Sequence, residues 1–169
     1  MLCAGILKNE LEGREGPKMR IRSSNEVQFL NSLGFQLTEA QKRTWSEILK
    51  DLTAKSPMRR LLQGDVGSGK TLVGALAALH TANNEWQTAF MCPTEILAEQ
   101  HHQTLSNWFS PLGLKVDLLT GSTTATRRKK IISELEEGKI NILVGTHALF
   151  QKDVVFYRLG LTVIDEQHR

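Results

Sequence analysis

The chain has 169 residues, of which 40% are hydrophobic and 23% are charged, and its formal net charge is +3 at pH 7. This is the composition of an ordinary globular domain with a core of its own. No apolar run reaches the roughly 18 residues of a membrane-spanning helix. We expect no secretory signal, because the N-terminal segment turns polar after residue 7 and is too short and too acidic for one. The two cysteines form no CxxC pair, so we expect neither a disulfide framework nor a zinc site. We expect the protein to occupy a reducing cytoplasm.

The residue pattern divides the chain into two parts of unequal length. Residues 1–34 carry many charges and no strand pattern, so we expect a linker in which residues 23–33 form a short helix, capped by Ser24 or Asn25 and ended by Gly34. From residue 35 onward helix and strand patterns alternate: helix 38–54, strand 59–63, helix 70–81, strand 88–92, helix 94–109, strand 115–119, helix 124–137, strand 140–144 and strand 161–164. Strands joined by helical crossovers predict an α/β fold with a mostly parallel sheet and helices on both faces.

A glycine-rich segment follows the first of the strands from residue 35 onward. Residues 64–71 fit the phosphate-loop pattern G-x-x-x-x-G-K-[ST], and the helix that begins at Lys70 points its positive end toward bound phosphates. We expect Lys70 to reach the β- and γ-phosphates of ATP and Thr71 to hold Mg²⁺. The alternative, a glycine turn before an ordinary helix, fits the pattern less well. The predicted nucleotide-binding residues of this loop are Gly64, Gly67, Ser68, Gly69, Lys70 and Thr71.

The last predicted strand ends in two carboxylates, Asp165 and Glu166. Ligands of open parallel sheets lie beyond the carboxyl ends of the strands, so we expect Asp165 beside the phosphate loop, where it binds Mg²⁺ through water. Glu166 is then expected to orient or deprotonate the water that attacks the γ-phosphate. A solvated turn is the alternative, and a phosphate loop in the same predicted sheet argues against it.

Residues 35–169 carry segments that resemble the motifs of superfamily 2 helicases and translocases, in the order of that family. The matching segments are 35–38 with Gln41 (Q-type motif), 93–98 with Gln100 and His101 (motif Ia), 120–122 (motif Ib), 144–149 (motif Ic) and 165–168 (motif II). The sequences of these segments are most similar to those of the first RecA-like motor domain in the RecG family of DNA helicases. This domain has a P-loop NTPase fold. Gln167 stands where the transcription-repair coupling factor and the primosomal helicase usually carry Glu, and these two families are the alternatives.

The resemblance implies an enzyme that binds ATP and Mg²⁺ and remodels branched or duplex DNA, including stalled forks and Holliday junctions, in recombination and repair. It implies that Phe35 packs near the base, that Gln41 reads the adenine edge, and that His168 couples the nucleotide site to the DNA face. It implies a bacterial, cytoplasmic and nucleoid-associated protein. The residues that it implies touch the DNA backbone are Pro93, Thr94, Gly121, Ser122, Thr146 and His147.

The same resemblance implies a second RecA-like domain, which supplies catalytic arginines, and a wedge domain. Because a parallel strand normally feeds a further crossover, we expect the chain to be a piece cut off just after motif II. We therefore expect residues 35–169 alone to bind ATP weakly and to hydrolyse it barely. Two other functions remain open, namely a P-loop kinase that acts on a small molecule and a non-catalytic nucleotide-binding module.

Several conspicuous residues also have plain structural explanations. Thr94 caps its predicted helix, and residues 120–122 can form an ordinary turn. The basic run at residues 127–130 points around most of a helix, which favours a solvated face over a DNA patch. His101 and His102 lack the spacing of a metal site. The tryptophans, which we expect to be core or half-buried packing residues, are Trp45, Trp86 and Trp108.

Overall fold

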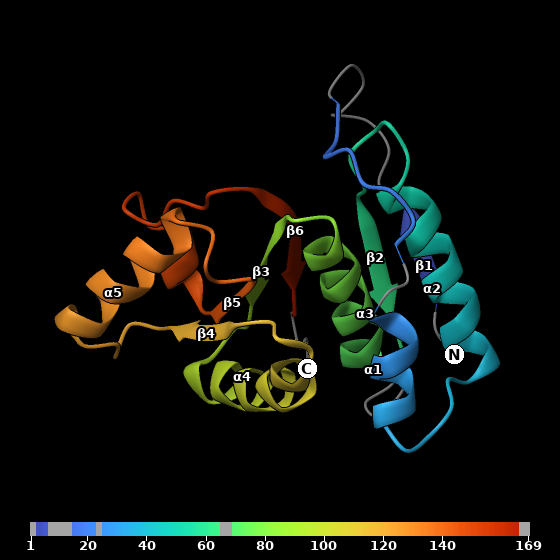
Figure 1. Cartoon of the computed structure of the whole chain (residues 1–169), viewed down its shortest axis with the longest axis horizontal. Helices are drawn as coiled ribbons and strands as arrows, with labels where there is room; N and C mark the ends of the chain where they lie inside the picture. Colours follow the sequence, from blue (N-terminus) through green and yellow to red (C-terminus); the bar gives the residue numbers. More distant parts are fainter. Residues whose placement is uncertain (1–2, 7–14, 23–24, 65–68, 166–169) are drawn as a thin grey trace. The chain divides into compact units, whose positions relative to one another are not determined.

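A computed structural model describes residues 3–6, 15–22, 25–64 and 69–165 of the chain. The chain divides into two compact units, Met1–Asn84 and Glu85–Arg169, and each unit has its own sheet (Figure 1). None of the helices in the described ranges combines the length and the apolar character that crossing a membrane requires. The predicted boundary between residues 34 and 35 stays a prediction.

The first unit consists of three helices and an antiparallel pair of strands. Its elements are β1 (Cys3–Ile6), α1 (Glu26–Ser32), α2 (Glu39–Leu52), β2 (Arg60–Gln63) and α3 (Lys70–Asn83). Trp45, Ile48 and Leu52 form the buried face of α2, and α3 is buried along most of its length. Gly34, with φ of +72°, follows α1, as the sequence predicts for a helix stop.

The pairing of β1 with β2 shows that two expectations were wrong. The sequence predicts no strand before residue 35, whereas Cys3–Ile6 pairs antiparallel with β2. The sequence also predicts that strand 59–63 shares a sheet with strand 161–164, whereas β2 belongs to the two-stranded sheet. The physical reason is that extended backbone needs only a neighbouring strand for its hydrogen bonds, and four residues are too few to show a strand pattern.

The segment before α1 packs onto the first unit. Met19 is buried, and the Asn84 side chain both accepts a hydrogen bond from the Arg20 amide (2.8 Å) and donates one to the Arg20 carbonyl (3.0 Å). The Asn25 side chain makes no capping bond for α1 and instead donates to Asn83 Oδ1 at 3.3 Å. The described residues 15–22 are thus fixed against the C-terminal end of α3.

The second unit confirms the predicted parallel sheet. Its elements are β3 (Gln87–Met91), α4 (Glu95–Phe109), the 3-10 helix η1 (Ser110–Leu112), β4 (Val116–Leu119), α5 (Ala125–Glu136), β5 (Ile142–Gly145), the 3-10 helix η2 (His147–Phe150) and β6 (Leu159–Ile164). The strand order is β4-β5-β3-β6, and every neighbouring pair is parallel. Helices α4 and α5 cover opposite faces of this sheet (Figure 1). The carboxyl ends of all four strands therefore lie along one edge.

Side chains alternate between the two faces of the sheet. Ala89 and Met91 of β3 join Ile131 and Leu135 of α5 in one buried cluster. Phe90, between them in β3, is directed to the other face, where its ring lies 5.0 Å from that of His101 of α4. This alternation is the two-residue period of a strand that is covered on both sides.

Gln87, the first residue of β3, is a buried polar residue whose side chain makes three hydrogen bonds. Its Nε2 donates to the carbonyls of Leu135 and Ile140, both at 2.9 Å, and its Oε1 accepts from the amide of Arg158 at 2.8 Å. Leu135 lies at the carboxyl-terminal end of α5, Ile140 precedes β5 and Arg158 precedes β6. One side chain at the start of β3 therefore holds the end of α5 and the beginnings of β5 and β6.

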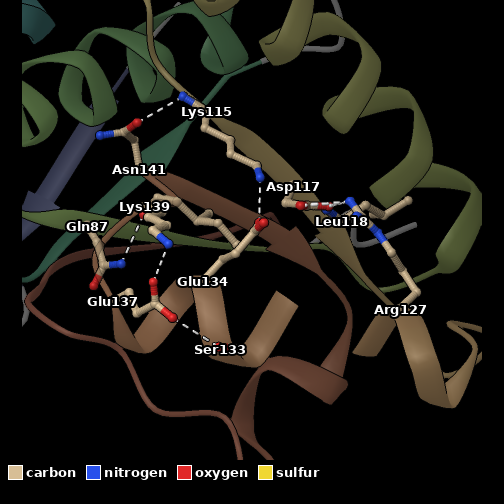
Figure 2. Close-up of polar contacts among 11 residues, drawn as sticks. Gln87, Lys115, Asp117, Leu118, Arg127, Ser133, Glu134, Glu137, Lys139 and Asn141 are labelled. Atoms are coloured by element: carbon tan, nitrogen blue, oxygen red, sulfur yellow. Dashed lines mark hydrogen bonds and ion pairs between the residues drawn. The ribbon is translucent and has the colours of Figure 1, made fainter. Parts of the chain in front are cut away.

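The basic run of α5 makes ion pairs with the body of the unit. Figure 2 shows Arg127 on Asp117 of β4, where one nitrogen lies 2.8 Å from each carboxylate oxygen. Arg128 pairs with Asp153 at 2.7 Å, and exposed Lys129 and Lys130 complete the run. The exposure of three of these four residues agrees with the predicted solvated face.

The three tryptophans are packing residues, as the sequence predicts. Trp45 is buried, and Trp86 and Trp108 are partly buried.

We predict that Gln87→Leu lowers the free energy of unfolding by about 3 kcal/mol, because it leaves two carbonyls and one amide without their buried partner. Urea denaturation followed by circular dichroism measures this change. Gln103→Leu, on the exposed side of α4, is the control and should change stability by less than about 0.5 kcal/mol. Equal effects of the two substitutions would contradict the role of Gln87.

We also predict a large cost for Gly145→Ala at the end of β5. A Cβ there would lie 2.1 Å from the Leu119 carbonyl oxygen and 2.8 Å from Leu149 Cδ2. The strands must separate, so we expect a loss of about 3 kcal/mol. Gly113→Ala is the comparison: no heavy atom lies within 4 Å of its Cβ, and only the positive φ of 74° opposes it, at about 1 kcal/mol. Thermal denaturation that ranks the two variants in the reverse order would refute this.

Candidate nucleotide and nucleic-acid site

The described part of the predicted phosphate loop lies in the first unit, whereas Gly67 and Ser68 lie outside the described residues. Gly69 caps α3 with φ of +81°, and a Cβ on it would lie 2.0 Å from Gln41 Nε2. Position 69 therefore favours glycine for its backbone angle and for the close approach of Gln41. Lys70 Nζ donates to the Gly64 carbonyl at 2.6 Å, so the cation is held at the first residue of the predicted loop.

Gln41 of the Q-type motif is fixed by a capping box. Its Oε1 accepts from the Thr38 amide at 2.9 Å, and Thr38 Oγ1 accepts from the Gln41 amide at 3.2 Å. The buried side chain of Gln41 thereby lies against Gly69, and the first turn of α2 is joined to the phosphate loop. This contact was not foreseen from the sequence. The predicted reading of adenine by Gln41 stays a prediction.

A surface pocket of about 500 Å³ lies next to the Q-type motif. Its lining residues are Leu30, Asn31, Gly34, Phe35, Gln36, Leu37 and Lys42. Phe35 is 55% exposed and offers an aromatic face, so the pocket is suited to a planar base. The predicted packing of Phe35 near the base of ATP stays a prediction.

Asp165 directly follows β6 in the second unit. Its amide donates to the Met91 carbonyl at 2.8 Å, so its place at the carboxyl edge of the sheet is fixed by the pairing of β6 with β3. Glu166 and His168 lie outside the described residues. Lys70 and Asp165 belong to different compact units, and their convergence on one nucleotide stays a prediction.

The residues predicted to touch DNA lie at the carboxyl ends of three neighbouring strands, as pairs after β3, β4 and β5. Five of them are exposed and Thr146 is partly buried: Pro93, Thr94, Gly121, Ser122, Thr146 and His147. Thr94 also caps α4, because its Oγ1 accepts from the Leu97 amide at 3.3 Å. The predicted cap is thus confirmed, and the exposed threonine stays available at the same edge as Asp165.

Glu95 ties two of these turns together. Its Oε1 accepts from the Ser122 amide at 3.2 Å, and its Oε2 accepts from Ser122 Oγ at 3.0 Å. Thr120 Oγ1 is a further 3.0 Å from Ser122 Oγ. The amide and the hydroxyl of Ser122 therefore both donate to the Glu95 carboxylate, and the predicted contact of Ser122 with the DNA backbone stays a prediction.

His101 is a residue of this edge whose role the sequence did not reveal. Its Nε2 lies 2.8 Å from Asp165 Oδ2, although the two residues are 64 positions apart. The available signal was its place on α4, where it shares a helical face with the buried residues Ala98 and Leu105. A histidine on an apolar face needs a polar partner, and here that partner is Asp165.

Cys92 directly follows β3, and its thiol has low reactivity. It is fully buried, and burial together with the nearby charge of Asp165 raises the pKa of its thiol to about 12. Because the thiolate is the reactive form, a raised pKa removes reactivity at every pH well below that value. Cys92 therefore has the character of a packing residue of this edge.

We predict that Cys92 of a Cys3→Ser variant does not react with a thiol-specific disulfide reagent at pH 8. About one thiol in 10⁴ is ionised four pH units below its pKa, and the group is also shielded. Absorbance of the released chromophore measures the reaction, and the urea-unfolded chain, which should react completely, is the control. Complete reaction of the folded chain within minutes would contradict the assignment.

Known proteins resemble this chain over most of its length. The family model described as DEAD/DEAH box helicase matches residues 38–169. The chain is 57% identical over 141 residues to the ATP-dependent DNA helicase RecG of Synechocystis sp., which covers 83% of the chain and 17% of that protein. It is 48% identical over 163 residues to RecG of Thermotoga maritima, which covers 96% of the chain and 21% of that protein.

A solved structure gives the same result. The structure described as RecG bound to a three-way DNA junction matches with a TM-score of 0.86 at 50% identity, over 92% of this chain and 21% of that one. The chain thus spans about a fifth of the length of the relatives that it matches. The chain belongs to the DEAD/DEAH box helicase family.

Proposed function

We propose that the chain is the ATP-binding motor region of a RecG-type DNA helicase. The whole protein would couple ATP hydrolysis to the remodelling of branched DNA, such as stalled forks and Holliday junctions, in the bacterial cytoplasm close to the nucleoid. The observation that carries the proposal is the single edge of the parallel sheet, which bears Asp165 after β6 and the exposed turns after β3, β4 and β5. The names of the relatives support the same function.

The nucleotide chemistry follows from groups at strand ends and at a helix start. Lys70 exchanges the Gly64 carbonyl for the terminal phosphates of ATP, and the α3 N-terminus adds its partial positive charge. Phe35 would receive the base in the pocket beside the Q-type motif. Glu166 would accept a proton from the attacking water while the water oxygen bonds to the γ-phosphorus, the bond to the bridging oxygen breaks and ADP leaves.

The oxygen donors at these positions fit Mg²⁺. The Thr71 hydroxyl on the first turn of α3 and the Asp165 carboxylate after β6 are hard ligands of the kind that Mg²⁺ binds, together with water and phosphate oxygens. Mg²⁺ supplies neutralisation of the charge that develops on the transferred phosphoryl group. A site of few protein ligands is usual for this ion, because it keeps several of its waters.

DNA binding through the exposed turns would read the backbone and not the base sequence. Hydroxyl and amide donors at strand ends and at the start of α4 suit phosphate oxygens. The predicted contacts are Thr94, Ser122, Thr146 and His147, with Pro93 and Gly121 shaping the turns. A second RecA-like domain and a wedge domain would complete the motor, and the first of these would supply the arginines for efficient hydrolysis.

We predict that a three-way DNA junction stimulates ATP hydrolysis by the full-length protein, measured as phosphate release. Lys70→Ala should reduce turnover at least about 100-fold, and Glu166→Gln should retain bound ATP while turnover falls to a similar extent. Lys50→Ala, an exposed lysine of α2, is the control with unchanged turnover. Near-normal turnover of Lys70→Ala would remove the site assignment. Equal rates with and without DNA would favour a small-molecule kinase.

A further inference from the structure

The contact between His101 and Asp165 joins the middle of α4 to the end of β6. His101 Nε2 lies 2.8 Å from Asp165 Oδ2, and the two side chains are 14% and 24% exposed. An aspartate carboxylate can only accept, so the imidazole tautomer with the hydrogen on Nε2 satisfies this bond. A hydrogen bond shielded to this degree holds the plane of a carboxylate better than a solvated one does.

The imidazole is itself held in place by packing. Its ring lies 5.0 Å from the ring of Phe90 at an interplanar angle of 42°, and Phe90 is almost fully buried in β3. His101 also shares the sheet-facing side of α4 with Ala98 and Leu105, which are fully buried. The donor atom of the imidazole thus has a fixed direction.

The polar surroundings of Asp165 point to a constrained carboxylate. Cys92, which precedes the turn after β3, is fully buried, and its thiol feels the charge of Asp165. The Asp165 amide is bound to the Met91 carbonyl at 2.8 Å. The backbone hydrogen bond and the imidazole together leave the carboxylate little orientational freedom, although Asp165 follows the last residue of its strand.

We propose that His101 is a positioning residue that orients the Asp165 carboxylate toward Mg²⁺, an assignment that rests on the proposed nucleotide site. Carboxylates that ligate a metal are commonly oriented by a second hydrogen-bonding group, and loss of such a group typically weakens metal binding about 10- to 100-fold. His101 would therefore set the affinity for the ion, and not the chemistry at the phosphate. The second histidine of the pair, His102, has no such partner among the hydrogen bonds of the described residues.

The test measures metal binding directly. Mn²⁺, which accepts the same oxygen ligands as Mg²⁺, is titrated into the full-length protein with a non-hydrolysable ATP analogue, and free Mn²⁺ is followed by electron paramagnetic resonance. We expect His101→Ala to weaken nucleotide-dependent Mn²⁺ binding about 10- to 100-fold. His101→Gln, whose amide nitrogen can occupy the place of Nε2, should restore binding to within about threefold of the unsubstituted protein, and the control His102→Ala should leave it unchanged.

A kinetic readout separates positioning from a loss of fold. The Mg²⁺ concentration for half-maximal ATP hydrolysis should rise about 10- to 100-fold in His101→Ala, while kcat at saturating Mg²⁺ stays within about threefold. A fall of kcat alone would overturn the proposal, as would unchanged Mn²⁺ binding in His101→Ala or a failure of His101→Gln to restore it. Absence of nucleotide-dependent Mn²⁺ binding in the unsubstituted protein would overturn the proposed function itself.

Discussion

The three hydrogen bonds of Gln87 fix the register on which the candidate site depends. They hold the end of α5 and the residues before β5 and β6 at the amino-terminal end of β3. Parallel strands of similar length that start at one edge of the sheet also end at the opposite edge, so the turns that follow them lie along that edge. The Cys92 amide on the Gly145 carbonyl and the Asp165 amide on the Met91 carbonyl close the opposite end. A buried amide side chain is a costly group to place in a core, and here its two donor bonds and one acceptor bond all serve this alignment.

Most helices and strands could be predicted from local residue chemistry, whereas features that depend on pairing between distant residues could not. Thr38 and Thr94 are capping residues by type and by position, and both accept the expected amide. Strand β1 could not be found in this way, since four residues acquire strand character only from their neighbour β2. The partner of His101 was hidden for the same reason, because 64 positions separate it from Asp165. The motif residues at strand ends were predictable because crossovers and parallel order follow from the alternation of helices and strands.

Helix α4 links the two functions that the site is proposed to combine. Its first turn carries Thr94 and Glu95, which reaches Ser122, and His101 meets Asp165 about two turns further on, roughly 10 Å along the axis. A helix packed on a sheet moves as a rigid body more readily than it bends. If a DNA strand displaced the turn before α4, the helix would therefore transmit the movement through His101 to the Asp165 carboxylate, with no loop between them. For the proposed function, α4 would then connect nucleotide binding with DNA binding, in addition to the coupling that the resemblance assigns to His168.

The ion pairs of α5 bear on how DNA binding should respond to salt. Positive groups that neutralise phosphates release condensed counterions, and the number released sets the slope of log affinity against log salt concentration. Arg127 and Arg128 already face Asp117 and Asp153, so half of the basic run is compensated within the protein. For the DNA binding proposed for this chain, the most basic stretch of the sequence would then add little to that slope. The dependence on salt would arise mainly from other cationic groups, and counting lysines and arginines along the sequence would overestimate it.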